Sequence, residues 1–324
     1  MGSGREEANV VVLGGGVSGL MAATVLTRAG VGVVVLDKGR RAGGRLASRR
    51  VGDATFDHGA QGFEMDRRNV TGALSGVEAS GAMVEWGDVG PCEAGRAWFR
   101  GQPSMSAVGR GMADGLDVRL ATEVVGVHGR EGRWIAVTKA GPGIEGSAMV
   151  VTVPVPQALA VMQAGRVGIE AGLRMRLEAI AYERCLAVMA LTEGPSRVAS
   201  SSGLVTGSGS IARITDNVRK GISAAPSVTV HSTHGFAMGH WDGDRVESGR
   251  RLIDEASGFL GVGVRAMEVH GWRYSHAVTR DRCRCVVASE SPLLVMAGDG
   301  FGAGGVEGAV LSGIAAAEAV LARR

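Results

Sequence analysis

One stretch near the start of the chain constrains the fold more than any other. Residues 10–23 read VVVLGGGVSGLMAA, an apolar run that breaks into glycines and then resumes with helical spacing. The pattern predicts a buried parallel strand over residues 9–13, a helix over 17–29 and a second strand over 32–36. A glycine turn between such a strand and helix is typical of a Rossmann-type βαβ unit that binds a dinucleotide.

The residues of this turn have distinct expected roles. Gly14 permits the tight turn, Gly16 lets a pyrophosphate approach the backbone, and Gly19 lets the helix pack closely on the strand. Asp37 ends the second strand and is expected to accept hydrogen bonds from the adenosine ribose. The motif does not distinguish NAD from FAD, and a purely structural glycine turn is the alternative.

Two further segments favour FAD. Gly43-Gly44-Arg45 follows the second strand, and its arginine can add positive charge beside the same pyrophosphate. Residues 297–313 read AGDGFGAGGVEGAVLSG, which predicts a strand over 293–297, the acid Asp299 and a helix over 306–322. The amino end of that helix would stabilise negative charge on a reduced flavin. Because this segment has no cysteine for a thioether, we expect FAD to be held non-covalently.

Composition excludes several other classes of protein. A net charge of +3 on 324 residues gives no reason to expect nucleic acid or a membrane surface as partner. The arginine-rich residues 39–50 fit a phosphate-binding site better than a nuclear localisation signal. The four cysteines (Cys92, Cys185, Cys283 and Cys285) do not form a disulfide framework, and Cys283-x-Cys285 is not a Cys-x-x-Cys redox motif. The first residues are acidic and lack the pattern of a signal peptide, and no apolar run is long enough to span a bilayer. These features predict a soluble cytoplasmic protein.

The order of elements predicts two interleaved domains. Nucleotide-type elements occur at both ends, residues 62–104 look irregular, and short strands separated by turns follow a helix at 105–116. Between residues 157 and 280 we expect strands at 185–191, 210–215, 227–232 and 267–274 and a helix at 244–259. The expected α/β fold has a Rossmann-type FAD domain (1–65, 105–153 and 280–324) and an α+β substrate domain with an antiparallel sheet (66–104 and 154–279). A ligand is expected between them.

Taken together, the motifs resemble the small flavin-containing amine-oxidase-like proteins, most closely their renalase-like branch. The matching segments run in order from residue 12 to residue 321 and include DKGRRAGGRLASRR, FDHGAQGF, VVTVPVPQAL, VHSTHGF and GWRYSHA. The resemblance implies a glutathione-reductase-like FAD fold and an oxidase of small molecules. Renalase-like enzymes oxidise dihydronicotinamide dinucleotide isomers and pass the electrons to O2, giving H2O2.

The resemblance also implies site residues by position. Those expected to contact FAD are Gly14, Gly16, Val17, Ser18, Gly19, Asp37, Lys38, Gly43, Gly44, Arg45, Gly59, Ala60, Gln61, Val124, Gly298, Asp299, Gly305, Val306 and Glu307, with main-chain groups of Val124 on the adenine. Those expected to face the flavin or the substrate are Gln61, Arg213, Asn217, His231, Phe236, Trp272 and Tyr274.

The chain also departs from the family pattern. Gly62, Arg213 and Phe236 stand where relatives tend to carry other, mostly aromatic, residues, so the substrate side loses aromatic surface and gains a cation. A flavin amine oxidase or dehydrogenase of an amine or amino-acid-like intermediate of secondary metabolism is therefore one alternative, and a non-catalytic flavin-binding protein is another. Hydride transfer to a flavin needs no acid or base, so no catalytic residue is assigned. His231 and His234 lack a third ligand nearby, and no metal is expected.

Overall fold

A computed structural model describes residues 6–141 and 143–324. Residues 1–5 and Pro142, which belongs to an expected turn, lie outside these ranges. The chain forms two compact units, each described by itself below. Unit 1 comprises Met1–Gly44, described from residue 6, with Gly109–Ala181 and Ala277–Arg324, and unit 2 comprises Arg45–Val108 and Tyr182–His276. These boundaries differ from the expected domain boundaries chiefly over residues 45–65 and 154–181.

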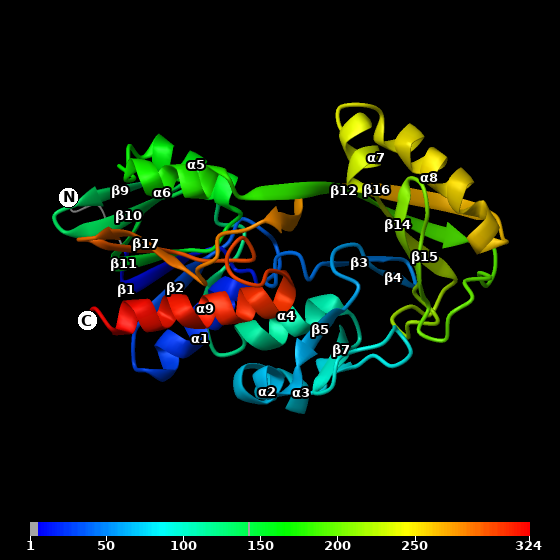
Figure 1. Ribbon diagram of the computed structural model, residues 1–324, viewed down its shortest axis with the longest axis horizontal. Helices are drawn as coiled ribbons and strands as arrows, with labels where there is room; N and C mark the ends of the chain where they lie inside the picture. The colour runs from blue at the N-terminus through cyan, green and yellow to red at the C-terminus, as the bar shows by residue number, and fades with distance from the viewer. Residues whose placement is uncertain (1–5, 142) are drawn as a thin grey trace. The chain divides into compact units, whose positions relative to one another are not determined.

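An eight-stranded sheet forms the centre of unit 1 (Figure 1). Its path is β17 (Val286–Glu290), β18 (Leu293–Met296), β11 (Ile144–Val151), β1 (Glu6–Leu13), β2 (Val33–Leu36) and β8 (Asp117–Arg119), with β10 (Arg133–Thr138) pairing β11 and β9 (Val124–Arg130). The pairs β1–β11, β1–β2, β11–β18 and β2–β8 are parallel. β2, β18, residues 10–13 of β1 and residues 148–151 of β11 are continuously apolar because both of their faces are buried.

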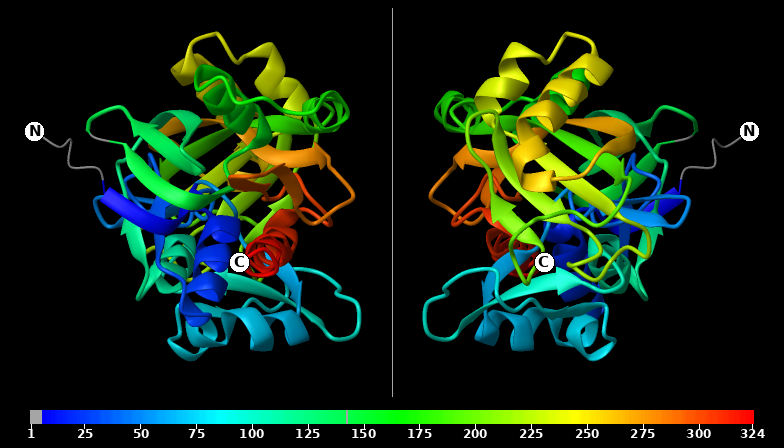
Figure 2. Two further views of the ribbon diagram at one scale, coloured as in Figure 1. Left: turned by 90° about the vertical axis from the view of Figure 1, so that its left-hand side faces the viewer. Right: turned by 90° about the vertical axis from the view of Figure 1, so that its right-hand side faces the viewer.

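Two long helices lie side by side against this sheet (Figures 1 and 2). Helices α1 (Val17–Arg28) and α9 (Gly305–Leu321) share an apolar cluster with the strands, including Leu26, Val150 and Ala317. A Cβ at Gly313 would lie 2.3 Å from the Ser18 carbonyl oxygen, so only glycine allows this approach. Helices α5 (Val155–Ala164), which packs on β9, and α6 (Ala171–Glu178) complete unit 1.

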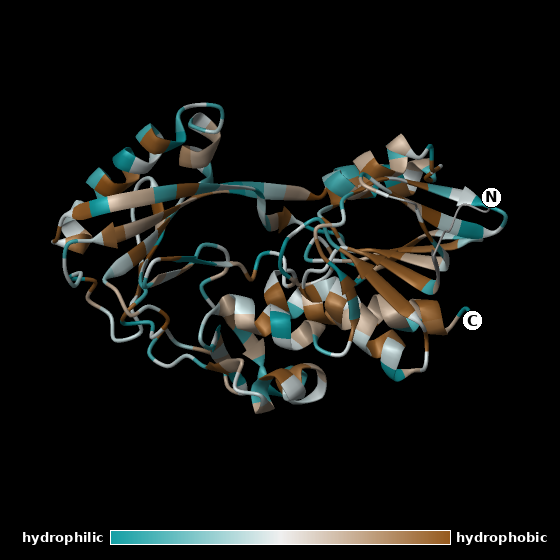
Figure 3. Ribbon diagram, turned by 180° about the vertical axis from the view of Figure 1, so that it is seen from behind, coloured by the Kyte–Doolittle hydropathy of each residue, from teal (hydrophilic) through white to brown (hydrophobic). Residues whose placement is uncertain are grey.

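A five-stranded antiparallel sheet organises unit 2. Its order is β13 (Leu204–Thr206), β14 (Ile211–Asp216), β15 (Ser227–Ser232), β12 (Ala181–Thr192) and β16 (Val264–Thr279). Helices α7 (His234–Gly239) and α8 (Arg245–Leu260) cover one face, where Leu186, Val230 and Leu252 share a core. Helix α8 alternates between hydrophilic and hydrophobic residues in Figure 3, as a half-buried helix does. Asp244 caps it by accepting hydrogen bonds from the amides of Val246 and Glu247.

The remaining part of unit 2 corrects one expectation. Residues 62–104, expected to be irregular, form a three-stranded sheet and a run of helical turns. The elements of this part are β3 (Ser48–Val51), β4 (Ala54–Asp57), β5 (Phe63–Asp66), α2 (Arg67–Asn69), the π-helical turn η1 (Val70–Leu74), α3 (Ser75–Ala79), β6 (Met83–Glu85), β7 (Arg96–Gly101) and α4 (Met105–Ala113). Most of them are three to six residues long. Such lengths are too short to produce a recognisable hydrophobic period.

Candidate functional site

In unit 1, the candidate cofactor residues gather at one edge of the parallel sheet. Strand β1 ends at Leu13, which pairs with Leu36 of β2 and with Val151 of β11, and Val151 pairs in turn with Met296 of β18. The segments after these residues therefore leave the sheet together. They contain Gly14, Asp37, Thr152 and Gly298-Asp299. The carboxyl edge of an open parallel sheet is where such folds bind their ligands.

The glycine turn after β1 has the geometry that its sequence predicts. Gly14 has a φ of 111°, which side chains disfavour. A Cβ at Gly19 would lie 1.9 Å from the Gly14 carbonyl oxygen. The hydroxyl of Thr152 donates to that same oxygen at 3.0 Å. Strand β11 thus fixes the turn from the neighbouring position in the sheet.

The amino end of α1 fits a pyrophosphate. Its N-cap is Gly16, no side chain caps the helix, and the first turn holds no acidic residue. A Cβ on Gly16 would meet nothing within 4 Å, whereas a Cβ on Gly44 would lie 3.2 Å from the Gly16 Cα. The amide of Gly43 donates to the carbonyl of Gly15 at 2.8 Å. Two glycine segments therefore form a backbone cradle at a helix N-terminus, which favours anions.

The end of the chain supplies a second helix amino end at this edge. Helix α9 starts after Gly304, again without a side-chain cap, and carries Glu307 in its first turn. Asp299 is buried just before it. The Ser312 hydroxyl accepts from the amide of Gly298 at 2.8 Å and so ties α9 to the segment that follows β18.

Asp37 anchors the turn as well as offering acceptors. Its two carboxylate oxygens accept from the amides of Gly15 and Gly39, each at 2.6 Å. Each oxygen keeps a further lone pair for a ribose hydroxyl. The amide of Thr122 donates to the Asp37 carbonyl at 2.8 Å, so the segment after β8 lies against the same residue.

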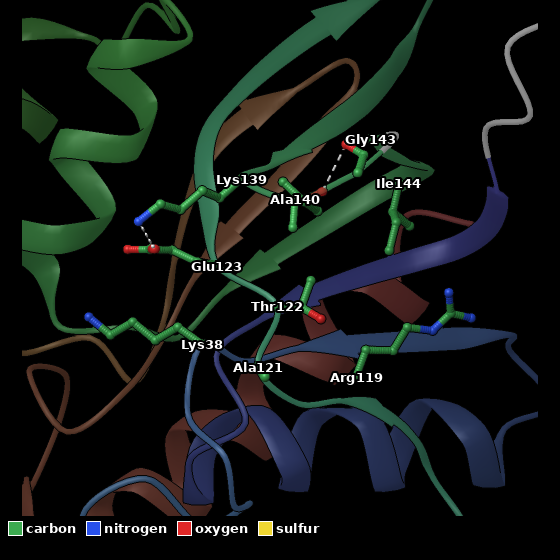
Figure 4. A pocket seen from close by; sticks show the side chains of 11 residues that line it. Lys38, Arg119, Ala121, Thr122, Glu123, Lys139, Ala140, Gly143 and Ile144 are labelled. Atoms are coloured by element: carbon green, nitrogen blue, oxygen red, sulfur yellow. Dashed lines mark hydrogen bonds and ion pairs between the residues drawn. The ribbon is translucent and has the colours of Figure 1, made fainter.

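A pocket of about 570 Å³ opens beside Asp37 (Figure 4). Lys38, Arg119, Glu123 and Lys139 are among its lining residues, and Lys139 donates to Glu123 at 3.1 Å. The lining is cationic in balance, as suits the phosphate-bearing half of a dinucleotide. Val124, expected at the adenine, is buried directly after Glu123.

In unit 2, a buried ion pair fixes the segment Asp57–Gln61, which carries the expected residues Gly59, Ala60 and Gln61. The ammonium of Lys220 lies 2.6 Å from the Asp57 carboxylate, and both side chains are fully buried. Lys220 also donates to Gln61 Oε1 at 3.3 Å, and Gln61 donates back to the Asp57 carbonyl. The same carboxylate accepts from the Ser48 hydroxyl at 2.5 Å and the Met105 amide at 3.0 Å.

Several expected substrate residues meet at the next residue, His58. The carbonyl of His58 accepts from the Trp272 indole at 2.7 Å and faces His231 Nε2 at 3.1 Å. The rings of His58 and Trp272 stack with centroids 5.6 Å apart. Burial, together with the positive charge of Arg213, lowers the pKa of His231 to about 4. His231 is therefore a neutral imidazole at neutral pH.

Strand pairing and hydrogen bonds connect three further expected residues to this group: Arg213, Tyr274 and Arg45. Arg213 of β14 pairs directly with His231 of β15, and directly paired residues of antiparallel strands share a face. The guanidinium of Arg45 donates to the carbonyls of Tyr274 and Ser275 at 3.2 and 3.4 Å. Within residues 6–141 and 143–324, the Arg213 guanidinium forms no hydrogen bond or ion pair. The nearby Cys185 is a neutral thiol, because burial raises its pKa to about 12.

Of the two remaining expected substrate residues, Phe236 lies away from this group, whereas Asn217 bonds to Thr229, which shares a face of β15 with His231. Phe236 lies in α7, stacks on His240 with centroids 4.1 Å apart and packs against the core on the helix-covered face. The structure does not bring it to the face that carries His231. Asn217 is fully buried beyond the end of β14 and accepts from the Thr229 hydroxyl at 3.3 Å.

Sequence reasoning missed Lys220 and its pairing with Asp57. Lys220 follows an arginine in the polar turn DNVRKG, where lysine is normally exposed. Burial lowers the pKa of Lys220, and the charge of Asp57 opposes this shift. Only the pairing across 163 positions of sequence reveals the role of the lysine. No local pattern could have found it.

Comparison with known proteins defines the class. Residues 71–321 match the family described as flavin containing amine oxidoreductase, and residues 12–75 match an NAD(P)-binding Rossmann-like domain. The chain belongs to the flavin-containing amine oxidoreductase family. It is an FAD-dependent oxidoreductase, and the expected α/β fold class is confirmed.

Solved structures agree with this fold. A putrescine oxidase bound to putrescine has a TM-score of 0.75 at 15% identity, covering 98% of this chain and 100% of its own. A protein from Exiguobacterium sp. 255-15 that carries a provisional protoporphyrinogen oxidase name has a TM-score of 0.72 at 13% identity, with full coverage of both chains. Within the described residues, no helix combines the length and apolarity that a membrane span requires.

Proposed function

We propose that this oxidoreductase oxidises a small anionic substrate, foremost a dihydronicotinamide dinucleotide isomer, with O2 as electron acceptor and H2O2 as product. The observation that carries the proposal is Arg213, an arginine without an ionic partner in the described chain, which shares a sheet face with the neutral His231. A cation in this position disfavours a diamine and favours a phosphate or carboxylate. The resemblance to renalase-like proteins supplies the dihydronicotinamide.

The residues of unit 1 would hold the cofactor. The cradle of Gly16, Gly43 and Gly44 would bind the pyrophosphate, Asp37 the adenosine ribose, and the segment from Gly298 to Glu307 the flavin half. FAD, when bound, supplies hydride acceptance and reoxidation by oxygen. Unit 1 is accordingly the proposed FAD domain, and unit 2 the proposed substrate domain.

The residues of unit 2 would bind and orient the substrate without exchanging protons. Arg213 would hold the anionic group, and Trp272, fixed by its bond to the His58 carbonyl, would offer an edge or face to a flat ring. The nitrogen lone pair of a dihydropyridine itself drives hydride departure. His231 therefore need not act as a base. Because its imidazole is neutral, it adds no second positive charge beside the Arg213 guanidinium.

The test is anaerobic reduction of the bound flavin. Mixed dihydronicotinamide dinucleotide isomers should bleach the flavin absorbance within the mixing time of a manual assay. Arg213→Met should raise the substrate concentration for half-maximal rate by roughly 10- to 150-fold, the cost of a hydrogen bond to a charged group, at an unchanged saturating rate. Arg219→Met is the matched control, since Arg219 is an exposed arginine whose nearest carboxylate, that of Asp216, lies 3.9 Å away.

The alternative is an amine oxidase or dehydrogenase that acts on an amino-acid-like intermediate. Here Arg213 would pair with the substrate carboxylate, and the family membership favours an amine nitrogen beside the oxidised carbon. A panel of small amines and amino acids in the same anaerobic assay separates the two candidates. Bleaching by an amino acid and not by any dihydronicotinamide would refute the first proposal. Bleaching by no compound at all would leave the non-catalytic flavoprotein as the better description.

A further inference from the structure

The loop before β17 holds an exposed cysteine in a strongly basic setting. Residues 280–285 read RDRCRC, so Cys283 lies between Arg282 and Arg284. Cys283 is exposed, and the guanidinium of Arg176 on α6 lies 3.6 Å from its sulfur. Positive charge beside an exposed sulfur stabilises the negative charge that the sulfur carries when it attacks an electrophile. Cys185, by contrast, is buried with a pKa raised to about 12, which makes it an inert thiol in the same protein.

A second cysteine lies within disulfide reach. Cys285 is half-buried, and its pKa is raised by burial and by negative charge on Cys283. Two residues apart, the Cα atoms are separated by at most about 7 Å even in an extended chain. The chain bends over residues 282–284 and is therefore not fully extended there, so the separation falls below this limit and toward the range that disulfides use. Cys283 is thus the exposed nucleophile and Cys285 a thiol that can resolve its oxidised form.

This loop is joined to the proposed flavin segment by direct hydrogen bonds. Asp281 pairs with Arg176 at 2.9 and 3.0 Å, its amide donates to the Gly300 carbonyl at 2.9 Å, and its carbonyl accepts from the Gly302 amide at 2.8 Å. The Ser312 hydroxyl donates to the Arg284 carbonyl at 2.5 Å and accepts from the Gly298 amide. Arg284 is the residue between the two cysteines, so their bridging must strain its carbonyl and the bond to Ser312.

We infer that Cys283 and Cys285 form a peroxide-sensitive modification site that controls FAD retention. The Cys283 thiolate attacks hydrogen peroxide, the O–O bond breaks, and a sulfenic acid and hydroxide result. The Cys285 sulfur then displaces hydroxide from the Cys283 sulfur, and the thiol proton joins that hydroxide as water. Two thiols and one peroxide give one disulfide and two waters. If the peroxide comes from the enzyme's own turnover, the site acts as product feedback, and that part of the inference rests on the proposed function. The reaction of the two thiols with peroxide does not depend on it.

The site itself is tested with added hydrogen peroxide on the purified holoprotein. Trypsin cleaves after Arg284, so the Cys283 and Cys285 peptides stay joined in the mass spectrum only if a disulfide links them. We expect this linked species from the wild type and from Cys92→Ser. Cys285→Ser should stop at a Cys283 sulfenic acid that dimedone traps. Unlinked peptides, or oxidation at Cys92 before Cys283, would overturn the site.

The basic setting is tested by two arginines of α6. Arg176→Gln should slow the peroxide reaction of Cys283 by roughly three- to tenfold, because the guanidinium 3.6 Å from the sulfur no longer stabilises the negative charge of the reacting sulfur and oxygen atoms. Arg174→Gln is the matched control, because Arg174 pairs with Glu178 at 3.2 Å on the exposed surface of the same helix. Equal rates in the two variants would refute the role of Arg176.

The coupling to FAD is tested by free-flavin fluorescence after ultrafiltration. Peroxide should raise the FAD dissociation constant several-fold in the wild type, with reversal by a dithiol, and leave Cys283→Ser unchanged. An equal rise in Cys283→Ser, or a disulfide without any rise, would refute the coupling. Because the peroxide is added, these results do not depend on whether the enzyme reduces oxygen. That question is answered separately, by peroxide formation during turnover.

Discussion

Removal of Lys220 should expose how much unit 2 depends on its buried ion pair. In Lys220→Met the apolar stem is retained, but Asp57 loses one of the three side-chain or backbone donors to its carboxylate. Breaking a buried pair costs about 3–5 kcal/mol. Since the Ser48 hydroxyl and the Met105 amide still bind the carboxylate, we expect the lower end, about 3 kcal/mol. Asp57→Asn should cost a similar amount because it leaves a buried, unpaired ammonium.

The assay is the urea midpoint of the FAD-loaded protein, with FAD in fixed excess. The double variant Lys220→Met/Asp57→Asn should lose clearly less than the sum of the two single losses, because neither charge is then left alone. Arg250→Met is the control: its pair with Glu247 is exposed, and such pairs are worth at most about 1 kcal/mol. A Lys220→Met protein as stable as Arg250→Met, or strict additivity in the double variant, would refute the reasoning.

Three further outcomes are expected. Asp37→Ala removes two charge-assisted backbone contacts as well as the ribose contact, so FAD affinity should fall at least roughly tenfold in ultrafiltration, with the unfolding midpoint of unit 2 preserved. Between pH 6.5 and about 4 the unfolded chain binds a proton at His231 that the folded chain excludes, so the free energy of unfolding falls as the pH falls. In urea titrations the wild type should therefore lose about 2 kcal/mol more than His231→Gln between pH 7.5 and 5. Equal losses in the two proteins would contradict this. Acid precipitation should release all flavin as intact FAD, and flavin that remains on the pellet would contradict non-covalent binding.

The sequence predicted those parts of the fold whose signals are local. The expected helix at 17–29 is α1 (Val17–Arg28), and the expected helix at 244–259 is α8 (Arg245–Leu260). In both cases capping groups and a hydrophobic stripe mark the element. The ribbon of β3 and β4 and the small sheet of β5, β6 and β7 were not predicted. Their strands are stabilised by pairing with each other, which no short window of sequence contains.

The candidate site likewise contains residues that local sequence predicts and residues that it does not. The glycine turn and Asp37 could be predicted because each position has a fixed geometric task within one βαβ unit. The contact of Trp272 with the His58 carbonyl and the pairing of Lys220 with Asp57 join residues more than 150 positions apart. The position of Phe236 could not be predicted either: α7 packs its ring against the helix-covered face of the sheet.

The parallel sheet of unit 1 has a consequence for biosynthesis. Strand β11 pairs with β1 from the first ten residues of the described chain and with β18 near the other end. While the ribosome has not yet delivered β18 and α9, β11 remains an edge strand with unpaired backbone groups, and α1 lacks its partner helix. Since Gly298–Glu307 is the proposed flavin segment, we expect the chain to load FAD only after residue 307 has been translated. Until β18 is made, residues 148–151 of β11 form an open sheet edge that is prone to aggregate.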